Sequence, residues 1–204
     1  MGFYRERILP HLTHLAMRQE NFSAYRRRVV SGASGRVLEI GIGSGLNLPH
    51  YGPGAERVVG IDPSQGLLSM SKRSAAGTRR SITLIEGSAE DIPLEDASVD
   101  TVLTTWTLCT IPEVETALRE MLRVLKPSGG LLFVEHGRSS DENVRRWQDR
   151  LTPLWRRISG GCHLNRPIRE LIEDAGFRIE QLETGYMKGL RPLTFICEGK
   201  ARPS

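Results

Sequence analysis

The segment that most constrains the fold is a short apolar run that leads into three glycines at alternate positions. Residues 36–40 are mostly aliphatic, and Gly41, Gly43 and Gly45 follow at once. Such a run predicts a buried strand, and glycines let the chain turn sharply and approach a ligand closely. A helix starting after the turn would offer free N–H groups to that ligand. The segment therefore predicts a strand–turn–helix unit that binds a ligand.

Strand and helix patterns alternate along the rest of the chain. Further strands are predicted at residues 57–61, 82–86, 99–104, 131–135, 178–182 and 194–197. Helices are predicted at 4–30, divided by Pro10, and at 64–75, 113–125, 142–157 and 168–175. This alternation is typical of α/β proteins with a doubly wound, seven-stranded and mostly parallel sheet. The last two strands have no predicted helix between them, so we expect them to pair antiparallel.

Charge and length exclude several classes of protein. The 204 residues fit a single domain. The net charge of +4 is mild and no aromatic residues interleave with the arginines, so we expect no nucleic-acid partner. The triplet Arg26–Arg28 reads as a solvated helix face, although it could attract an anionic surface or substrate.

The cysteines and the N-terminal segment indicate in which cellular compartment we expect the protein. Cys109, Cys162 and Cys197 are widely spaced and form no C-x-x-C pair, so we expect neither a structural zinc site nor a disulfide framework. This favours a cytoplasmic protein. Residues 1–30 carry charges throughout, so we expect no signal peptide or integral membrane segment, and any membrane contact would be peripheral.

Two features beyond the glycine turn point to a nucleoside ligand. Asp62 lies 21 residues after Gly41, at the end of the next strand, where a carboxylate can accept both ribose hydroxyl protons. Residues 87–93 follow the third strand and place polar groups where an adenine edge would lie. An NAD-binding turn has its third glycine one residue later than Gly45, and the length leaves little room for a dehydrogenase's substrate domain.

Four motifs occur in order along residues 35–136: Val37–Gly45, Asp62–Ser64, Ala89–Pro93 and Arg123–Pro127. Together they resemble the signature of class I S-adenosylmethionine-dependent methyltransferases of the methyltransferase type 11 group. The resemblance implies S-adenosylmethionine as cofactor and methyl transfer to a small-molecule acceptor. It also implies that Glu39 and the Gly41–Gly45 loop hold the methionine part. Asp62 would bind the ribose, with Pro63 and Ser64 beside it.

The resemblance implies further contacts on the adenine side. Ala89 and Glu90 would frame the adenine, and Thr105 would line the other side of the cofactor. Ser88 stands where many relatives carry an acid that contacts the adenine amine, so that contact would fall to the backbone. Ser128 replaces the first glycine of the usual Pro-Gly-Gly turn.

The C-terminal part narrows the resemblance. Glu135–His136, Pro153–Trp155 and Gly161–Arg166 look like the thiol S-methyltransferase branch, the alkyl-thiol enzymes of animals, whose N-terminal membrane anchor we do not find in residues 1–30. The acceptor would then be an alkyl thiol. Small bacterial phospholipid N-methyltransferases share much of the core, so phosphatidylethanolamine is the alternative acceptor. A non-catalytic S-adenosylmethionine-binding module is a third reading.

His136 is the candidate catalytic residue. It follows the fifth strand, and active sites of open α/β sheets lie beyond the carboxyl ends of the strands. Because the methyl group is already activated on a sulfonium, the protein mainly has to orient donor and acceptor. His136 would take or direct the thiol proton. The alternative is a histidine that only hydrogen-bonds a loop backbone.

Several other side chains could have either a structural or a functional role. Cys162 is expected to be a small packing residue rather than a catalyst. Arg166 would bind an anionic group or pair with Glu170. Residues 1–30 and 137–167 would form a lid over the acceptor, with residues 35–136 as the cofactor-binding core. The tryptophans would line an acceptor pocket or belong to a core-facing stripe: Trp106, Trp147 and Trp155.

Overall fold

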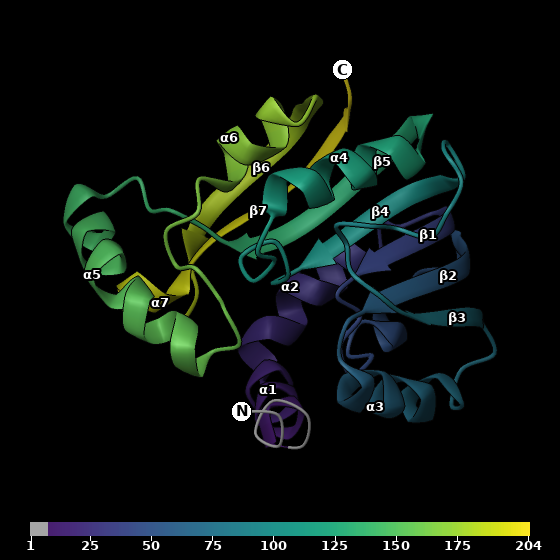
Figure 1. The fold of residues 1–204 in the computed structure, drawn as a ribbon, viewed down its shortest axis with the longest axis horizontal. Coiled ribbons are helices and arrows are strands. Elements are labelled where there is room, and N and C mark those ends of the chain that lie inside the picture. Colours follow the sequence, from purple (N-terminus) through teal and green to yellow (C-terminus); the bar gives the residue numbers. More distant parts are fainter. Residues whose placement is uncertain (1–7) are drawn as a thin grey trace.

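The computed structural model describes residues 8–204, which form one sheet between two layers of helices (Figure 1). The strands are β1 (Gly35–Ile40), β2 (Ala55–Asp62), β3 (Ser81–Glu86), β4 (Val99–Thr105), β5 (Leu125–His136), β6 (Phe177–Tyr186) and β7 (Phe195–Pro203). The helices are α1 (Leu9–Met17), α2 (Glu20–Val30), the 3₁₀ helix η2 (Leu48–His50), α3 (Gln65–Ala75), α4 (Val114–Val124), α5 (Glu142–Ile158), α6 (Ile168–Asp174) and α7 (Arg191–Thr194).

The predicted doubly wound sheet is confirmed. In the described residues it has seven strands in the order β3-β2-β1-β4-β5-β7-β6. The first five run parallel, and β7 pairs antiparallel with both β5 and β6. The expected antiparallel pair at the C-terminus is therefore present, although the four-residue helix α7 lies between its strands, where we had expected none.

Each face of the sheet has its own hydrophobic core. Side chains alternate between the faces of a strand, so Leu38 and Val37 belong to different cores. Leu38 packs with α4 and α6 through residues such as Leu118, and Val37 packs with α2 and α3 through residues such as Val30. Val30 is fully buried, so the end of the expected N-terminal lid is part of the core.

Pro10 lies in the first turn of α1, a position that helices tolerate. The division expected at Pro10 also concerns the chain before residue 8, so it stays a prediction. The break between α1 and α2 falls at Arg18 and Gln19. The part of the expected helix before residue 8 lies outside the described residues.

The helix expected after the glycine turn is also absent. Only the single turn η2 follows, and the chain then enters β2. Pro49 lies inside this turn and Pro53 follows it closely, and a proline disfavours the α-helical conformation of the residue before it. By contrast, α3 begins as predicted, because the Ser64 hydroxyl accepts a hydrogen bond from the Leu67 N–H at 3.3 Å.

The chain passes from α4 to β5 without a connecting loop. The apolar stripe of α4 is confirmed, since Val114, Leu118 and Met121 are buried. The helix ends at Val124, and Leu125 already belongs to β5. Residues 125–130 thus extend the strand that the sequence predicted only at 131–135.

The carboxyl ends of the parallel strands meet at one side of the molecule, where α1, α2, α5 and α7 also lie (Figure 1). This is the side on which open α/β sheets bind their ligands. Within residues 8–204, no helix combines the length and the apolar character that crossing a membrane requires.

Gly60 connects the packing of β2 to the glycine turn, and it supplies the first test. A Cβ at Gly60 would lie 2.3 Å from the side chain of Ile42, inside the turn. We expect Gly60→Ala to lower the free energy of unfolding by about 1–3 kcal/mol, because Ile42 is buried and has to move. Urea unfolding measures this change. Gly77→Ala is the control, because its nearest neighbour would be the Ser74 carbonyl oxygen at 3.5 Å. Equal stability of the two variants would contradict the prediction.

Candidate functional site

The glycine turn has the geometry that a ligand cradle needs. Gly41, Gly43 and Gly45 all have positive φ angles, of 66°, 57° and 79°. A Cβ at Gly41 would lie 2.5 Å from the Thr107 side chain, so this glycine permits a close approach within the protein. A Cβ at Gly43 would meet only the Gly41 carbonyl oxygen, at 3.8 Å. The turn is therefore open at Gly43, where a ligand can approach the backbone.

Asp62 joins this turn to the start of α3. Its side chain is buried at the end of β2. One carboxylate oxygen accepts a hydrogen bond from the Gly43 N–H at 3.0 Å, and the other accepts one from the Ser64 N–H at 2.8 Å. Burial raises the pKa of Asp62, and the two N–H groups oppose this shift. The structure thus brings together three residues predicted for the ribose and methionine parts, whereas the neighbouring Pro63 is exposed.

Glu39 forms a second buried polar centre, and two of its partners were not anticipated from the sequence. Its carboxylate accepts hydrogen bonds from Asn47 Nδ2 and from the Tyr51 hydroxyl, both at 2.7 Å. Asn47 Nδ2 also donates to Thr105 Oγ1 at 3.0 Å, which links β1 to the end of β4. Burial raises the pKa of Glu39 to about 7. Asn47 and Tyr51 lie outside the sequence motifs, so only the folded chain identifies them.

This centre fits the amino-acid end of S-adenosylmethionine. Asn47 Oδ1 is buried and has no hydrogen-bond donor, and it lies on the side chain that also contacts Glu39. A buried acceptor without a partner and a buried carboxylate are both costly. An ammonium group would satisfy both of them, and the methionine part of the cofactor carries one.

The residues expected around the adenine lie after β3. Ser88 Oγ donates to Glu90 Oε2 at 2.6 Å, and Glu90 Oε1 accepts from the Glu113 N–H at 2.8 Å. The Ser88 hydrogen bond, followed by that N–H, lowers the pKa of Glu90. Ala89 between them is buried. Ser88 therefore holds Glu90 in place instead of presenting an acid of its own.

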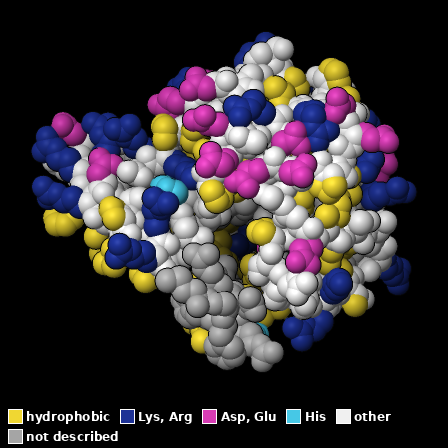
Figure 2. Space-filling view, viewed as in Figure 1, with side chains coloured by type: hydrophobic (Ala, Val, Ile, Leu, Met, Phe, Trp, Pro, Cys, Tyr) yellow, Lys and Arg dark blue, Asp and Glu magenta, His cyan; other side chains and the backbone are white. Residues whose placement is uncertain are grey.

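Helix α2 covers the end of β4. Trp106 follows Thr105 with a positive φ of 52°, and its ring packs edge-on against Phe22 with centroids 4.9 Å apart. The Arg26 guanidinium lies 5.1 Å from the Trp106 ring, and burial lowers the pKa of Arg26 to about 10. Figure 2, drawn in the orientation of Figure 1, shows a hollow in the middle of the visible surface, near the end of β4. Trp106 is thus a core residue under α2.

His136 lies beside two cysteines that are far apart in the chain. Its Nδ1 is 3.5 Å from the sulfur of Cys162, which is 3.4 Å from the sulfur of Cys109. Cys162 is buried, as expected of a packing residue. The hydrogen bond with Cys109, and then His136, lower the pKa of the Cys162 thiol, whereas that of Cys109 is raised well above its usual range. The wide sequence spacing of the cysteines concealed this group.

Two buried charged residues hold the loop that carries Cys109. Glu135 accepts hydrogen bonds from the N–H groups of Thr107 at 3.0 Å and Cys109 at 3.4 Å, and burial raises its pKa to about 7. Arg166 donates to the carbonyl oxygens of Leu108 and Ile111. Among the described residues, Arg166 therefore contacts backbone carbonyls and forms no ion pair with Glu170, while its contact with an anionic ligand stays a prediction.

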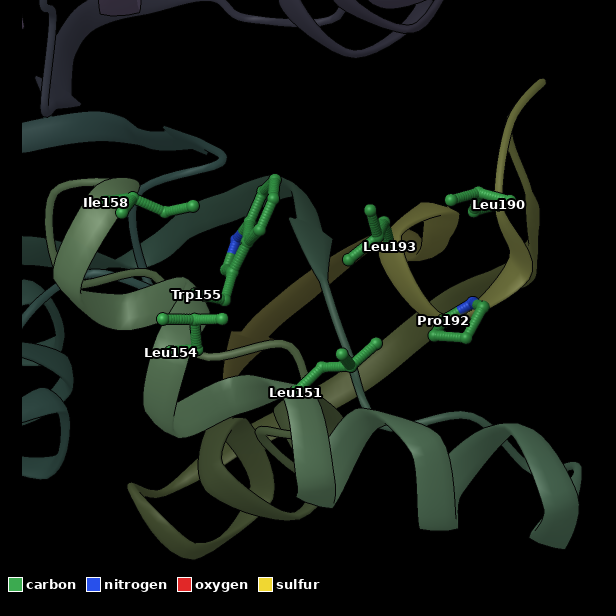
Figure 3. A pocket seen from close by; sticks show the side chains of 7 residues that line it. All are labelled: Leu151, Leu154, Trp155, Ile158, Leu190, Pro192 and Leu193. Atoms are coloured by element: carbon green, nitrogen blue, oxygen red, sulfur yellow. The ribbon is translucent and has the colours of Figure 1, made fainter.

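An apolar pocket of about 280 Å³ lies between α5 and the segment that contains α7. Figure 3 shows Trp155 of α5 and Leu193 of α7 facing each other across it. The Trp155 indole N–H lies close enough to Cys162 to help lower the pKa of that thiol, although it makes no well-formed hydrogen bond. Trp147 is 54% exposed and does not share a core-facing stripe with Trp155. The lining residues are Leu151, Leu154, Trp155, Ile158, Leu190, Pro192 and Leu193.

Residues 38–133 match the family described as "Methyltransferase domain". The chain is 36% identical over 160 residues to thiol S-methyltransferase TMT1B of Rattus norvegicus, covering 76% of this chain and 65% of that protein. It is 34% identical to phosphatidylethanolamine N-methyltransferase of Cereibacter sphaeroides, and this match covers 54% of this chain and 57% of that protein. The chain thus covers less than two thirds of the length of either relative.

Solved structures share the fold. A structure described as a SAM-dependent methyltransferase, possible histamine N-methyltransferase, from Thermotoga maritima has a TM-score of 0.73. It is 21% identical in sequence, and the match covers all of both chains.

The buried Glu39 predicts an unusual dependence of stability on pH. Below about pH 4.5 it is protonated in both the folded and the unfolded chain; between about 4.5 and 7 only the folded chain keeps the proton. The free energy of unfolding contributed by Glu39 therefore falls as pH rises through this window, by on the order of 3 kcal/mol.

Urea unfolding at several pH values tests this expectation in the ligand-free protein. Glu39→Gln should remove the Glu39 share of the dependence, because the amide stays neutral and can still hydrogen-bond to Tyr51. The share of Glu135, whose pKa burial also raises to about 7, should remain. Glu95→Gln makes the same change at an exposed site and should leave the dependence unaltered. If Glu39→Gln behaved like Glu95→Gln, the Glu39 carboxyl would not be titrating in this range.

Proposed function

We propose that this chain is an S-adenosylmethionine-dependent methyltransferase and that it methylates a small, fairly apolar thiol. Residues 38–133 match the methyltransferase domain family. The binding of S-adenosylmethionine is supported by one observation. The glycine turn, Asp62 and the buried Glu39–Asn47 pair lie together at one edge of the sheet. The acceptor half is supported by the relatives that are thiol S-methyltransferases and by the apolar pocket beside Trp155.

The cofactor-binding residues act by holding and orienting. Asp62 would accept hydrogen bonds from the ribose hydroxyls, while its contact with Gly43 keeps the turn in place. Glu39 and Asn47 would bind the ammonium group, and Thr105 would line the cofactor beside Asn47. S-adenosylmethionine supplies a methyl group already activated on a sulfonium, so orientation accounts for most of the catalysis. Ser88, Ala89 and Glu90 would frame the adenine.

The acceptor would enter from the side of α5 and α7. An apolar pocket suits an alkyl group, and its residue Trp155 belongs to α5, the helix that Cys162 follows; Cys162 in turn lies 3.5 Å from His136. We propose that His136 orients the acceptor sulfur and assists loss of its proton. Residues 1–30 and 137–167 would cover the site, with Val29 and Val30 belonging to the core rather than to a movable lid. A cytoplasmic location, with its cysteines reduced, is part of the same proposal.

A phospholipid amine is the second candidate acceptor, and the surface of α5 favours it. Trp147, Leu154 and Ile158 are more than half exposed on this helix. Figure 2 shows basic and hydrophobic side chains beside one another over α5, at the left of the view. Arg150 packs over the Trp147 ring at 5.7 Å. Such a surface suits peripheral contact with an anionic membrane.

Calorimetry with S-adenosylmethionine tests the cofactor half. Asp62→Ala should reduce the affinity at least tenfold, because it removes a carboxylate that accepts hydrogen bonds from both the ribose and the turn. Asp174→Ala, at an exposed position at the end of α6, makes the same change elsewhere and should bind normally. Undiminished binding by Asp62→Ala would remove Asp62 from the site. Binding of NADH in place of S-adenosylmethionine would overturn the proposed activity.

A methyl-transfer assay over thiols, amines and phenols tests the acceptor half. We expect turnover of a short alkyl thiol, and Leu193→Asn should raise the KM for that thiol several-fold because it places an amide in the apolar pocket. The same variant should bind S-adenosylmethionine with unchanged affinity. Turnover only with vesicles containing phosphatidylethanolamine would favour the lipid acceptor, and no turnover with any acceptor would favour a non-catalytic binding module.

A further inference from the structure

Three side chains that favour soft metal ions meet where the sheet ends. Cys109 lies in the loop after β4, His136 ends β5, and Cys162 follows α5. One ligand atom from each lies within 4.8 Å of the others. Thiolate and imidazole are the ligands that zinc prefers in proteins. The proposed methyl transfer gives no role to either cysteine.

The distances between these atoms are close to those of a zinc site. With Zn–S about 2.3 Å and Zn–N about 2.05 Å, tetrahedral angles place two sulfurs roughly 3.8 Å apart and a sulfur and a nitrogen roughly 3.5 Å apart. The corresponding separations are 3.4 Å between the two sulfurs and 3.5 Å between Cys162 Sγ and His136 Nδ1. The third separation, between Cys109 and His136, lies within 4.8 Å, so closing the three ligands around a cation takes a movement of about an ångström or less.

The backbone around the ligands is already held in position. The Cys109 N–H donates to Glu135, and the Cys109 carbonyl oxygen accepts from the His163 N–H at 2.8 Å. Arg166 holds the carbonyl oxygens of the adjacent residues Leu108 and Ile111. Metal sites rely on such surrounding contacts to orient their ligands, so this loop needs little rearrangement on binding.

We propose that Cys109, Cys162 and His136 bind one divalent zinc-type cation and leave its fourth coordination position open. The two cysteines would bind as thiolates, releasing their protons to solvent, and would balance the charge of the cation. Three protein ligands with one open position is the pattern of catalytic rather than structural zinc sites.

The open position suggests what the cation does, and this step rests on the proposed function. The pocket is lined by Trp155 near the end of α5, and Cys162 follows the same helix, so we place the acceptor thiol between the pocket and the cation. The thiol would replace a bound water, lose its proton to solvent and remain as a metal-bound thiolate. His136 would then act on the acceptor through the cation, as one of its ligands.

Cobalt(II) added to the reduced full-length protein tests the site without any methyl transfer. We expect one equivalent per chain and a thiolate-to-cobalt charge-transfer band. Cys109→Ser and Cys162→Ser should each lose the band and the tight uptake. Cys197→Ser removes the remaining buried cysteine, which lies on β7 outside the group, and should retain both. Uptake that is absent from the wild type, or equal in all three variants, would overturn the site.

A second measurement avoids variants that fail to fold. X-ray absorption at the zinc edge of the wild-type protein should report two sulfur ligands at about 2.3 Å and at least one nitrogen. A shell of oxygen and nitrogen alone would overturn the proposal. Asp62→Ala should take up cobalt normally, so loss of cofactor binding and loss of the metal site are separable.

A short alkyl thiol tests the open position. Adding it to the cobalt protein should strengthen the charge-transfer band, because a third sulfur joins the cation. A spectrum that does not respond would overturn the open position and return the acceptor chemistry to His136 alone.

Discussion

A single buried carboxylate, that of Asp62, holds the glycine turn against the start of α3. Its two oxygens bind the N–H groups of Gly43 and Ser64, which belong to different βα units. The turn that this carboxylate holds has positive φ angles at its three glycines and open space at Gly43. Because parallel strands end at the same edge, the contact also aligns the turn with the end of β4 and with the loop after β3.

Two further buried carboxylates lie near the same edge of the sheet and have different hydrogen-bond partners. Glu39 contacts neutral donors beside an unpaired acceptor on Asn47, an arrangement that a cationic ligand would complete. Glu135 is satisfied by the backbone N–H groups of the loop it holds. Burial raises the pKa of both to about 7. The ligand-free protein therefore gives up stability at neutral pH to keep these groups dry, and cofactor binding can offset the cost at Glu39.

The family match covers the residues proposed for the cofactor but not those proposed for the acceptor. The match to the methyltransferase domain ends at residue 133, so it covers β1 to β4 and most of β5. His136, Cys162 and the pocket between α5 and α7 lie beyond it. The segments proposed for the acceptor thus lie outside the shared core, and the named relatives methylate different acceptors.

Local patterns in the sequence determined the elements and the cofactor motif. Aliphatic runs predicted the strands, Ser64 predicted the start of α3, and the spacing from Gly41 to Asp62 predicted a nucleoside site. The predictions of the strands and of the start of α3 succeed because their causes, hydrophobic periodicity and capping, act over a few residues. The missing helix after Gly45 shows the limit of the same signals, because Pro49 and Pro53 disfavour the α-helical conformation of the residues before them.

Only the tertiary structure decided which distant side chains meet. Asn47 and Tyr51 reach Glu39 because η2 folds back over β1, and Arg166 binds a loop more than fifty residues earlier in the chain. Cys109 and Cys162 come within 3.4 Å because the loop after β4 and the chain after α5 end at the same edge. No periodicity links such residues, since their contacts follow from the order of the strands in the sheet and not from spacing along the chain.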